Sequence, residues 1–108
     1  MDITTLAAAL EEIEHALQHF LNEPDSNGAL LEVLHRRHAT LNEPYGFDPD
    51  TDALRQRVWR DCVTVISNLE LTPEAQAAMS EPMRAQVQKL ETLTRGLIDL
   101  VGPLGQKH

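Results

Sequence analysis

The sequence has one cysteine, few aromatic residues and no long apolar run, and each scarcity excludes a class of protein. A single cysteine, Cys62, cannot form an intrachain disulfide, so the fold needs no oxidising compartment. No apolar segment approaches the roughly 20 residues that span a bilayer. The N-terminus lacks a basic segment, and Glu11, Glu12 and Glu14 interrupt its apolar pattern, so we expect no signal peptide. Together these features predict a soluble cytoplasmic protein.

Basic residues are also scarce. The chain has 9 Lys and Arg against 17 Asp and Glu, which gives a formal net charge of −8. Because nucleic acids and anionic membranes bind clusters of Lys and Arg, this balance argues against both as partners. Residues 1–34 contain no Lys or Arg, whereas arginines are frequent in the middle of the chain. These arginines are Arg36, Arg37, Arg55, Arg57 and Arg60.

Two interpretations of this arginine-rich region remain open. In the first, the acidic N-terminal helix lies beside it, and the opposite charges pair within the molecule. In the second, the arginines form an exposed patch that binds an acidic partner. If the protein binds another protein, we expect the specificity determinants to be Glu11, Glu12, Glu14 and the five arginines.

Aromatic residues make up only 4% of the chain, so aliphatic residues must fill the core, and their type favours helices over sheets. Residues 54–69 have the widest apolar arc at about 100° per residue. We therefore expect a central helix from Leu54 to Leu69 that is contacted on two sides. Its predicted apolar face consists of Leu54, Val58, Trp59, Cys62, Val63, Val65, Ile66 and Leu69.

Helical periodicity and capping signals predict four further helices. The first spans 3–22, the second begins at 27 or 28 and ends at 41, a short one spans 73–79, and the last ends at Val101 before Gly102-Pro103. Asn-Glu-Pro stops the first two helices, since the residue before a proline is disfavoured in the α region. The sequence therefore predicts one all-α domain, residues 1–108, folded as a small four- to five-helix up-down bundle.

Residues near the helix ends give local predictions. We expect Asp2, or a nearby threonine, to cap the first helix, and Asp25 and Ser26 to cap the second. Thr72 before Pro73 is a strong N-cap signal. The remaining expected caps, for the central helix, are Asp50, Thr51 and Asp52.

The histidines suggest an alternative function. His15 and His19 are four residues apart, and His35 and His38 are three apart, which are spacings that place metal ligands on one helical face. A hairpin of the first two helices would bring the pairs to similar heights, so a histidine-based metal-binding protein remains an alternative. Because His15 and His19 lie opposite the apolar face, we expect solvated histidines and no metal cofactor.

Recognisable catalytic patterns are missing. Asp48, Asp50 and Asp52 resemble the opening of a calcium loop, but Ala53 and Trp59 replace its glycine and its bidentate glutamate. The sequence contains no nucleophile elbow, phosphate loop or dinucleotide fingerprint. Cys62 lies on an apolar face and is expected to be inert. We therefore predict that the protein is not an enzyme and needs no cofactor, with a small helical enzyme subunit as the alternative.

One family resemblance concerns residues 10–41. The order of a long acidic helix, a short loop and the segment ALLEVLHRRHATL (29–41) resembles the flagellar and type III export chaperones, on spacing alone. The resemblance implies amphipathic helices that hold an export substrate or a regulator.

Elimination and composition lead to the same class of function. We predict a small acidic protein-binding module, acting as an adaptor, inhibitor or chaperone on a basic or helical partner protein. The wide apolar arc of 54–69, together with Met79, Met83 and Leu104, also makes a homodimer an open alternative to a monomer.

Overall fold

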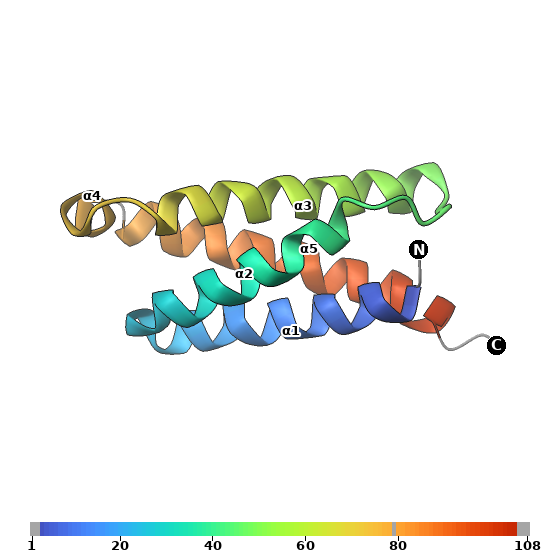
Figure 1. Ribbon diagram of the computed structural model, residues 1–108, viewed down its shortest axis with the longest axis horizontal. Helices are drawn as coiled ribbons and strands as arrows, with labels where there is room; N and C mark the ends of the chain where they lie inside the picture. The colour runs from blue at the N-terminus through green and yellow to red at the C-terminus, as the bar shows by residue number, and fades with distance from the viewer. Residues whose placement is uncertain (1–2, 79, 106–108) are drawn as a thin grey trace.

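A computed structural model of the protein describes residues 3–78 and 80–105. The described residues form four long helices and one short one. Figure 1 shows that the long helices run alternately along the molecule, with the short helix at one end. The described residues contain no strand, so the predicted all-α up-down bundle is confirmed. The elements are α1 (Ile3–Asn22), the 3-10 turn η1 (Pro24–Ser26), α2 (Asn27–Leu41), α3 (Pro49–Leu69), α4 (Pro73–Ala78) and α5 (Ser80–Gly105).

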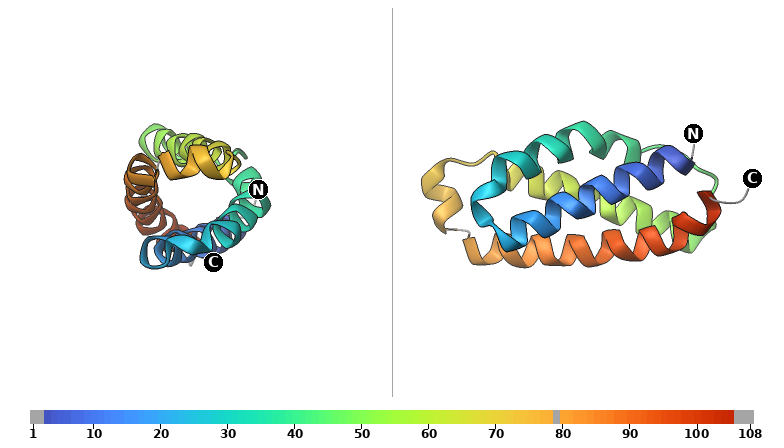
Figure 2. Two further views of the ribbon diagram at one scale, coloured as in Figure 1. Left: turned by 90° about the vertical axis from the view of Figure 1, so that its left-hand side faces the viewer. Right: turned by 90° about the horizontal axis from the view of Figure 1, so that it is seen from below.

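The four long helices form a ring. Helix α1 packs against α2 and α5, and α3 packs against the same two neighbours from the other side. The end-on view in Figure 2 shows α1 and α3 on different sides of this ring. Helix α3 is thus contacted on two sides, as its wide apolar arc predicts. The outer faces of α1 and α3 consequently point in different directions.

One cluster of aliphatic side chains from all four long helices fills the ring. On α1 the buried apolar residues include Leu6, Leu10, Ile13 and Leu17, and Phe20 is the buried aromatic residue of the cluster. On α3 the buried apolar residues are Val58, Cys62, Val65, Ile66 and Leu69.

One apolar residue of α3 departs from the sequence prediction. Val63, expected on the buried face, is 38% exposed, because it lies outside the arc that α2 and α5 cover. Met83 is buried in the core as its helical periodicity predicts, so it does not add the apolar surface that was suggested for self-association. Met79 and the side chain of Leu104, the other residues named for self-association, lie outside what the structure describes.

Helix α3 begins at Pro49 and therefore earlier than the predicted Leu54. Asp48 is its N-cap, and its Oδ2 accepts a hydrogen bond from the Thr51 backbone N–H at 3.2 Å. The Thr51 hydroxyl donates to Asp48 Oδ1 at 2.7 Å. The expected caps Asp50, Thr51 and Asp52 thus lie inside the first turns. Proline at the first helical position explains this start, because the missing N–H has no intrahelical partner there.

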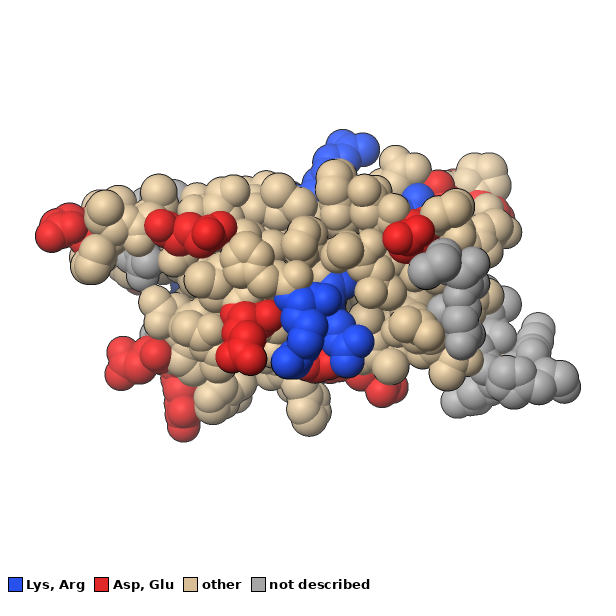
Figure 3. Space-filling model, viewed as in Figure 1, with Lys and Arg blue, Asp and Glu red and all other residues tan. Residues whose placement is uncertain are grey.

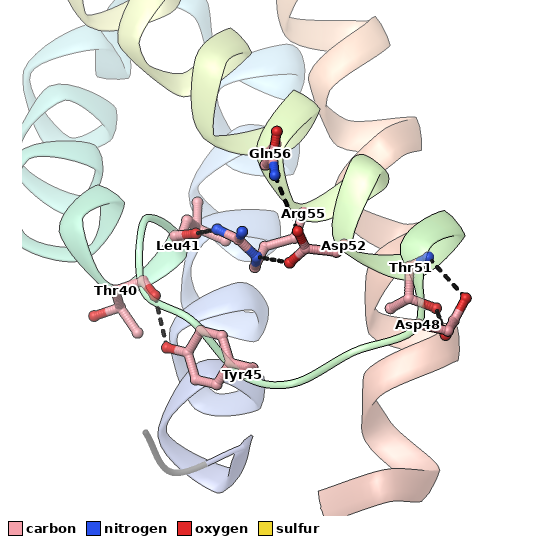
Figure 4. A network of polar contacts seen from close by, with 8 residues as sticks. All are labelled: Thr40, Leu41, Tyr45, Asp48, Thr51, Asp52, Arg55 and Gln56. Carbon is pink, nitrogen blue, oxygen red and sulfur yellow. Dashed lines mark hydrogen bonds and ion pairs between the residues drawn. The ribbon is translucent and has the colours of Figure 1, made fainter.

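A buried arginine links the end of α2 to the first turns of α3 (Figure 4). Arg55 is only 7% exposed, and its Nη1 donates to the Leu41 carbonyl oxygen at 2.6 Å. Its Nε donates to Asp52 Oδ1 at 2.8 Å, and this bond holds the pKa of Asp52 below its usual range. The Tyr45 hydroxyl donates to the Thr40 carbonyl oxygen at 2.6 Å. The extended segment 42–48 is therefore held at its α2 end by one side chain from α3, Arg55, and by one from the segment itself, Tyr45.

Other helix ends test the capping predictions. Thr72 caps α4 by accepting the Ala75 N–H at 3.3 Å, as predicted. The Ser26 side chain makes no cap hydrogen bond to α2, because its hydroxyl donates to the Glu23 carbonyl in the 3-10 turn that precedes the helix. Helix α5 continues through Pro103 to Gly105, contrary to the predicted end at Val101. A residue before proline is disfavoured in the helical conformation because its Cβ clashes with the proline ring. Gly102 has no Cβ, so the helix can continue into Pro103 at a lower cost. The predicted cap Asp2 lies outside the described residues.

Val65 and Val63 provide a matched test of this packing. Val65 is 1% exposed, so Val65→Ala should lower the free energy of unfolding by roughly 1–3 kcal/mol through lost burial and a residual cavity. Val63→Ala makes the same chemical change on the same helix at a 38% exposed position, and should cost less than half as much. Urea denaturation of both variants gives the comparison, and equal costs would contradict the assignment of the buried face.

Arg55 gives a second stability prediction. Arg55→Met keeps most of the aliphatic stem but removes the donor to the buried Leu41 carbonyl, so it should cost about 1–3 kcal/mol. Arg57→Met, on the same helix at an exposed position, should change stability by no more than about 0.5 kcal/mol. The measurement is again the free energy of unfolding in urea. If both variants are equally stable, Arg55 does not anchor the segment 42–48.

Candidate functional site

The acidic face of α1 contacts α2 through Glu12. Arg37 Nε donates to Glu12 Oε2 at 2.7 Å, and Arg36 donates to Glu12 Oε1. These hydrogen bonds, from Arg37 first and Arg36 second, hold the pKa of Glu12 below its ordinary value of 4.5. Arg36 also lies 3.8 Å from Glu32 on its own helix. In Figure 3 basic and acidic side chains adjoin in this way near the middle of the molecule. For Arg36 and Arg37, therefore, the interpretation of charge pairing within the molecule is confirmed.

Glu14 contacts α5 on the other flank of α1. Gln18 Nε2 donates to Glu14 at 2.9 Å and to Glu91 at 3.2 Å. Arg95 lies 3.6 Å from Glu14 and 3.4 Å from Glu91, so one guanidinium faces two carboxylates. Glu14 is thus partly neutralised by a residue of the bundle itself. Its carboxylate helps to join α1 and α5 and remains at the edge of the outer surface.

An open hollow of about 550 Å³ lies over the outer face of α1 and reaches α5. Ala8 and Ile98 give it an apolar part, and three glutamates and a histidine surround that part. Among these polar residues, Glu11 and His15 are exposed and make no ion pair with any described residue. The hollow is lined by Ala8, Glu11, Glu12, Glu14, His15 and Ile98. We call this set the α1 hollow.

The chemistry of the α1 hollow suits a basic side chain. A lysine or arginine has an aliphatic stem that could cover Ala8 and Ile98, and a cationic head that would meet carboxylates at the rim. Glu11 has the largest share of uncompensated negative charge, since Glu12 and Glu14 face arginines of the bundle. The structure thus brings together the three glutamates that the sequence identified. Ile98 and Ala8 were not predicted, because the sequence alone does not show which part of α5 reaches the outer face of α1.

The five predicted arginines have three different environments. Arg36 and Arg37 pair with Glu12. Arg55 is buried, so the expectation that it belongs to an exposed patch is wrong: its guanidinium bonds to Leu41 and Asp52 inside the fold. Arg57 and Arg60 are exposed on α3 and form no ion pair within the described residues. Only these last two have the environment that an exposed arginine patch requires.

The histidines lie apart from any common site. His19 is 3.6 Å from Glu23, His35 is 3.7 Å from Glu70, and His38 Nδ1 is 2.9 Å from the Leu34 carbonyl oxygen. His15 lines the α1 hollow. No group of three or more His, Cys, Asp or Glu side chains within residues 3–78 and 80–105 is arranged to hold a metal ion.

Cys62 lies at the centre of the buried face of α3 and is fully buried. Desolvation, with a smaller contribution from the nearby charge of Asp61, raises the pKa of its thiol to about 12. A thiol in this environment stays protonated at neutral pH, and the protonated form is a poor nucleophile. The expectation of an inert cysteine agrees with this geometry.

Comparisons with known proteins add no relative: no family model, curated protein or solved structure matches this chain. The helices in the described part of the chain also fall short of the combined length and apolarity that a bilayer crossing requires.

The charge pairing of Glu12 leads to a prediction about pH. The pKa of Glu12 is lowered in the folded state, so its pairing stabilises the fold above the unfolded pKa and is lost as pH falls through the folded pKa. In Arg37→Gln we expect the pKa of Glu12 to rise towards 4.5, because the first of its hydrogen bonds is removed. Carbon-detected NMR titration of the carboxyl groups measures this directly.

Arg95→Gln is the matched control for this titration, since Arg95 contacts Glu14 and Glu91 and not Glu12. It should leave the Glu12 titration unchanged. A wild-type Glu12 that titrates at or above 4.5 would show that the pair with Arg37 does not form in solution.

Proposed function

We propose that this protein is a small protein-binding module, an adaptor, inhibitor or chaperone, that binds a basic segment of a partner protein at the α1 hollow. The observation that supports this proposal is the hollow itself, which combines apolar side chains with a rim of glutamates on a helix fixed along both flanks. A rigid surface of this kind loses little conformational freedom on binding.

The charge of the whole chain supports the same partner chemistry. A net charge of −8 attracts a basic segment from a distance and raises the rate of encounter. The ion pairs of Glu12 and Glu14 hold α1 against its neighbours, and Glu11 is left free to meet an incoming cation. On this proposal the specificity of the site comes from Glu11 and the apolar part, with Glu12, Glu14 and His15 as its borders.

Glu11→Lys tests the proposal with little risk to the fold, because Glu11 is exposed and has no partner among the described residues. We expect this variant to weaken partner binding by roughly 1 kcal/mol, or about fivefold, since it replaces an attraction by a repulsion at the rim. Glu74→Lys makes the same charge change on α4, at the far end of the molecule (Figure 1), and should leave affinity close to wild type.

The experiment captures partners from native extract with the wild type and both variants, and then measures the affinity of each purified pair by calorimetry. Binding at the α1 hollow should also weaken with added salt, because the rim charges are exposed to solvent. A partner that binds Glu11→Lys as tightly as wild type does not use the hollow. Capture of no protein, together with a specific small-molecule ligand, would contradict the proposal as a whole.

A further inference from the structure

Four cations of this acidic protein have no carboxylate partner among the described residues. Arg57 and Arg60 lie exposed on α3, and Arg84 and Lys89 lie exposed on α5. Arg84 donates instead to the Leu21 carbonyl oxygen at 3.0 Å, whereas the arginines that form ion pairs each face at least one carboxylate. In a chain with 17 Asp and Glu, two unpaired arginines on one helix are a feature to be explained.

Arg57 and Arg60 lie one helical turn apart, so their side chains are neighbours on the outer face of α3. Val63 lies one turn further along and is 38% exposed, which makes it one of the few large apolar residues open to solvent. Trp59, the single tryptophan of the chain, is half-buried and shares the Val63 side of the helix. In Figure 3 basic side-chain atoms project outward over α3. We call Arg57, Arg60 and Val63 the basic face of α3.

A small hollow of about 110 Å³ adjoins this face in the seam between α3 and α5. Its lining includes Asp61 and Lys89, which have opposite charges. A continuous polyanion laid across α3 would bring phosphates close to Asp61, and the net charge of −8 would repel it from further away. Separate carboxylates can meet Arg57 and Arg60 and avoid Asp61. The charge pattern therefore favours an acidic protein segment over a nucleic acid.

We propose that the basic face of α3 binds an acidic helix of a partner protein. Two carboxylates one turn apart on that helix match the spacing of Arg57 and Arg60, and an apolar side chain beside them covers Val63. The interaction is complementary in charge at one end and apolar at the other, which fixes the direction of the bound helix.

This inference goes beyond the proposed function and uses different residues. The α1 hollow attracts basic segments, and the basic face of α3 attracts acidic ones. The two surfaces belong to helices that do not neighbour each other in the ring. Glu11→Lys should therefore leave binding at α3 intact, so failure at one surface is distinguishable from failure at the other.

A designed helical peptide is the probe, with glutamates about one turn apart beside leucine. A second peptide, with lysine in place of each glutamate, is its charge-reversed control. Emission of Trp59 reports binding, because this side chain adjoins the proposed contact and no other tryptophan is present. We expect the acidic peptide to shift the emission and to bind more tightly than the lysine peptide.

Arg60→Glu should weaken binding of the acidic peptide at least about fivefold, and Arg57→Glu with Arg60→Glu should weaken it further. Arg84→Glu is the matched control, since Arg84 is an exposed arginine on α5 whose reversal changes the net charge equally and removes only an exposed hydrogen bond to the Leu21 carbonyl. Circular dichroism establishes that each variant is folded. Arg84→Glu should bind nearly as tightly as the wild type.

Three results would overturn the proposal. Equal losses in Arg60→Glu and Arg84→Glu would show general attraction and no site on α3. Single-stranded oligothymidine that binds more tightly than the peptide, and loses affinity in Arg60→Glu, would make the face a nucleic-acid surface. If the acidic peptide causes no change in Trp59 emission and has no measurable affinity, the basic face of α3 does not bind an acidic helix.

Discussion

The buried guanidinium of Arg55 is the constraint on which the arrangement of α2 and α3 depends. A charged group taken out of water is costly unless its donors find acceptors. Arg55 meets this requirement with the Leu41 carbonyl and the Asp52 carboxylate, one on each of the two helices. Because these acceptors belong to both sides of the segment 42–48, the ends of the two helices must lie at one distance from each other.

Hydrophobic periodicity predicted the helices well. The main errors concern polar residues that occupy positions on a buried helical stripe. The stripe Val58, Cys62, Val65 and Leu69 extends backwards through Arg55 to Thr51, and both of these residues are buried. The sequence made Arg55 a candidate for partner binding, a role that requires exposure, and arginine is usually exposed. Its position on the stripe was the signal that it is buried. Its acceptor, however, is a backbone carbonyl on another helix, which residue type does not reveal.

The start of α3 was missed for a similar reason. Asp48-Pro49 has the same capping pattern as Thr72-Pro73, which correctly located α4. The apolar stripe begins only at Leu54, so the polar first turns do not resemble an amphipathic helix. The candidate site could be predicted in part: three glutamates of α1 were identified, but not their different partners. Which side chains form ion pairs between two helices depends on how each helix is rotated about its own axis. The composition of the chain does not determine that rotation.

The division of charge between structural and free groups connects the fold to the two proposals. Glu12, Glu14 and Arg95 are ionised side chains whose attraction is used within the bundle, so they add little net field outside it. Glu11 on α1 and the exposed arginines Arg57 and Arg60 on α3 are not compensated in this way, and they lie on helices separated by α2 and α5. A molecule with uncompensated charges of opposite sign on two separated faces is suited to hold a basic segment and an acidic segment at the same time.

If both surfaces bind, the two partners do not compete for space, and the attraction between them assists the complex because their charges are opposite. An adaptor has this property, whereas an inhibitor that covers one site does not require it, so the separation of the two faces favours the adaptor among the three forms of the proposed function.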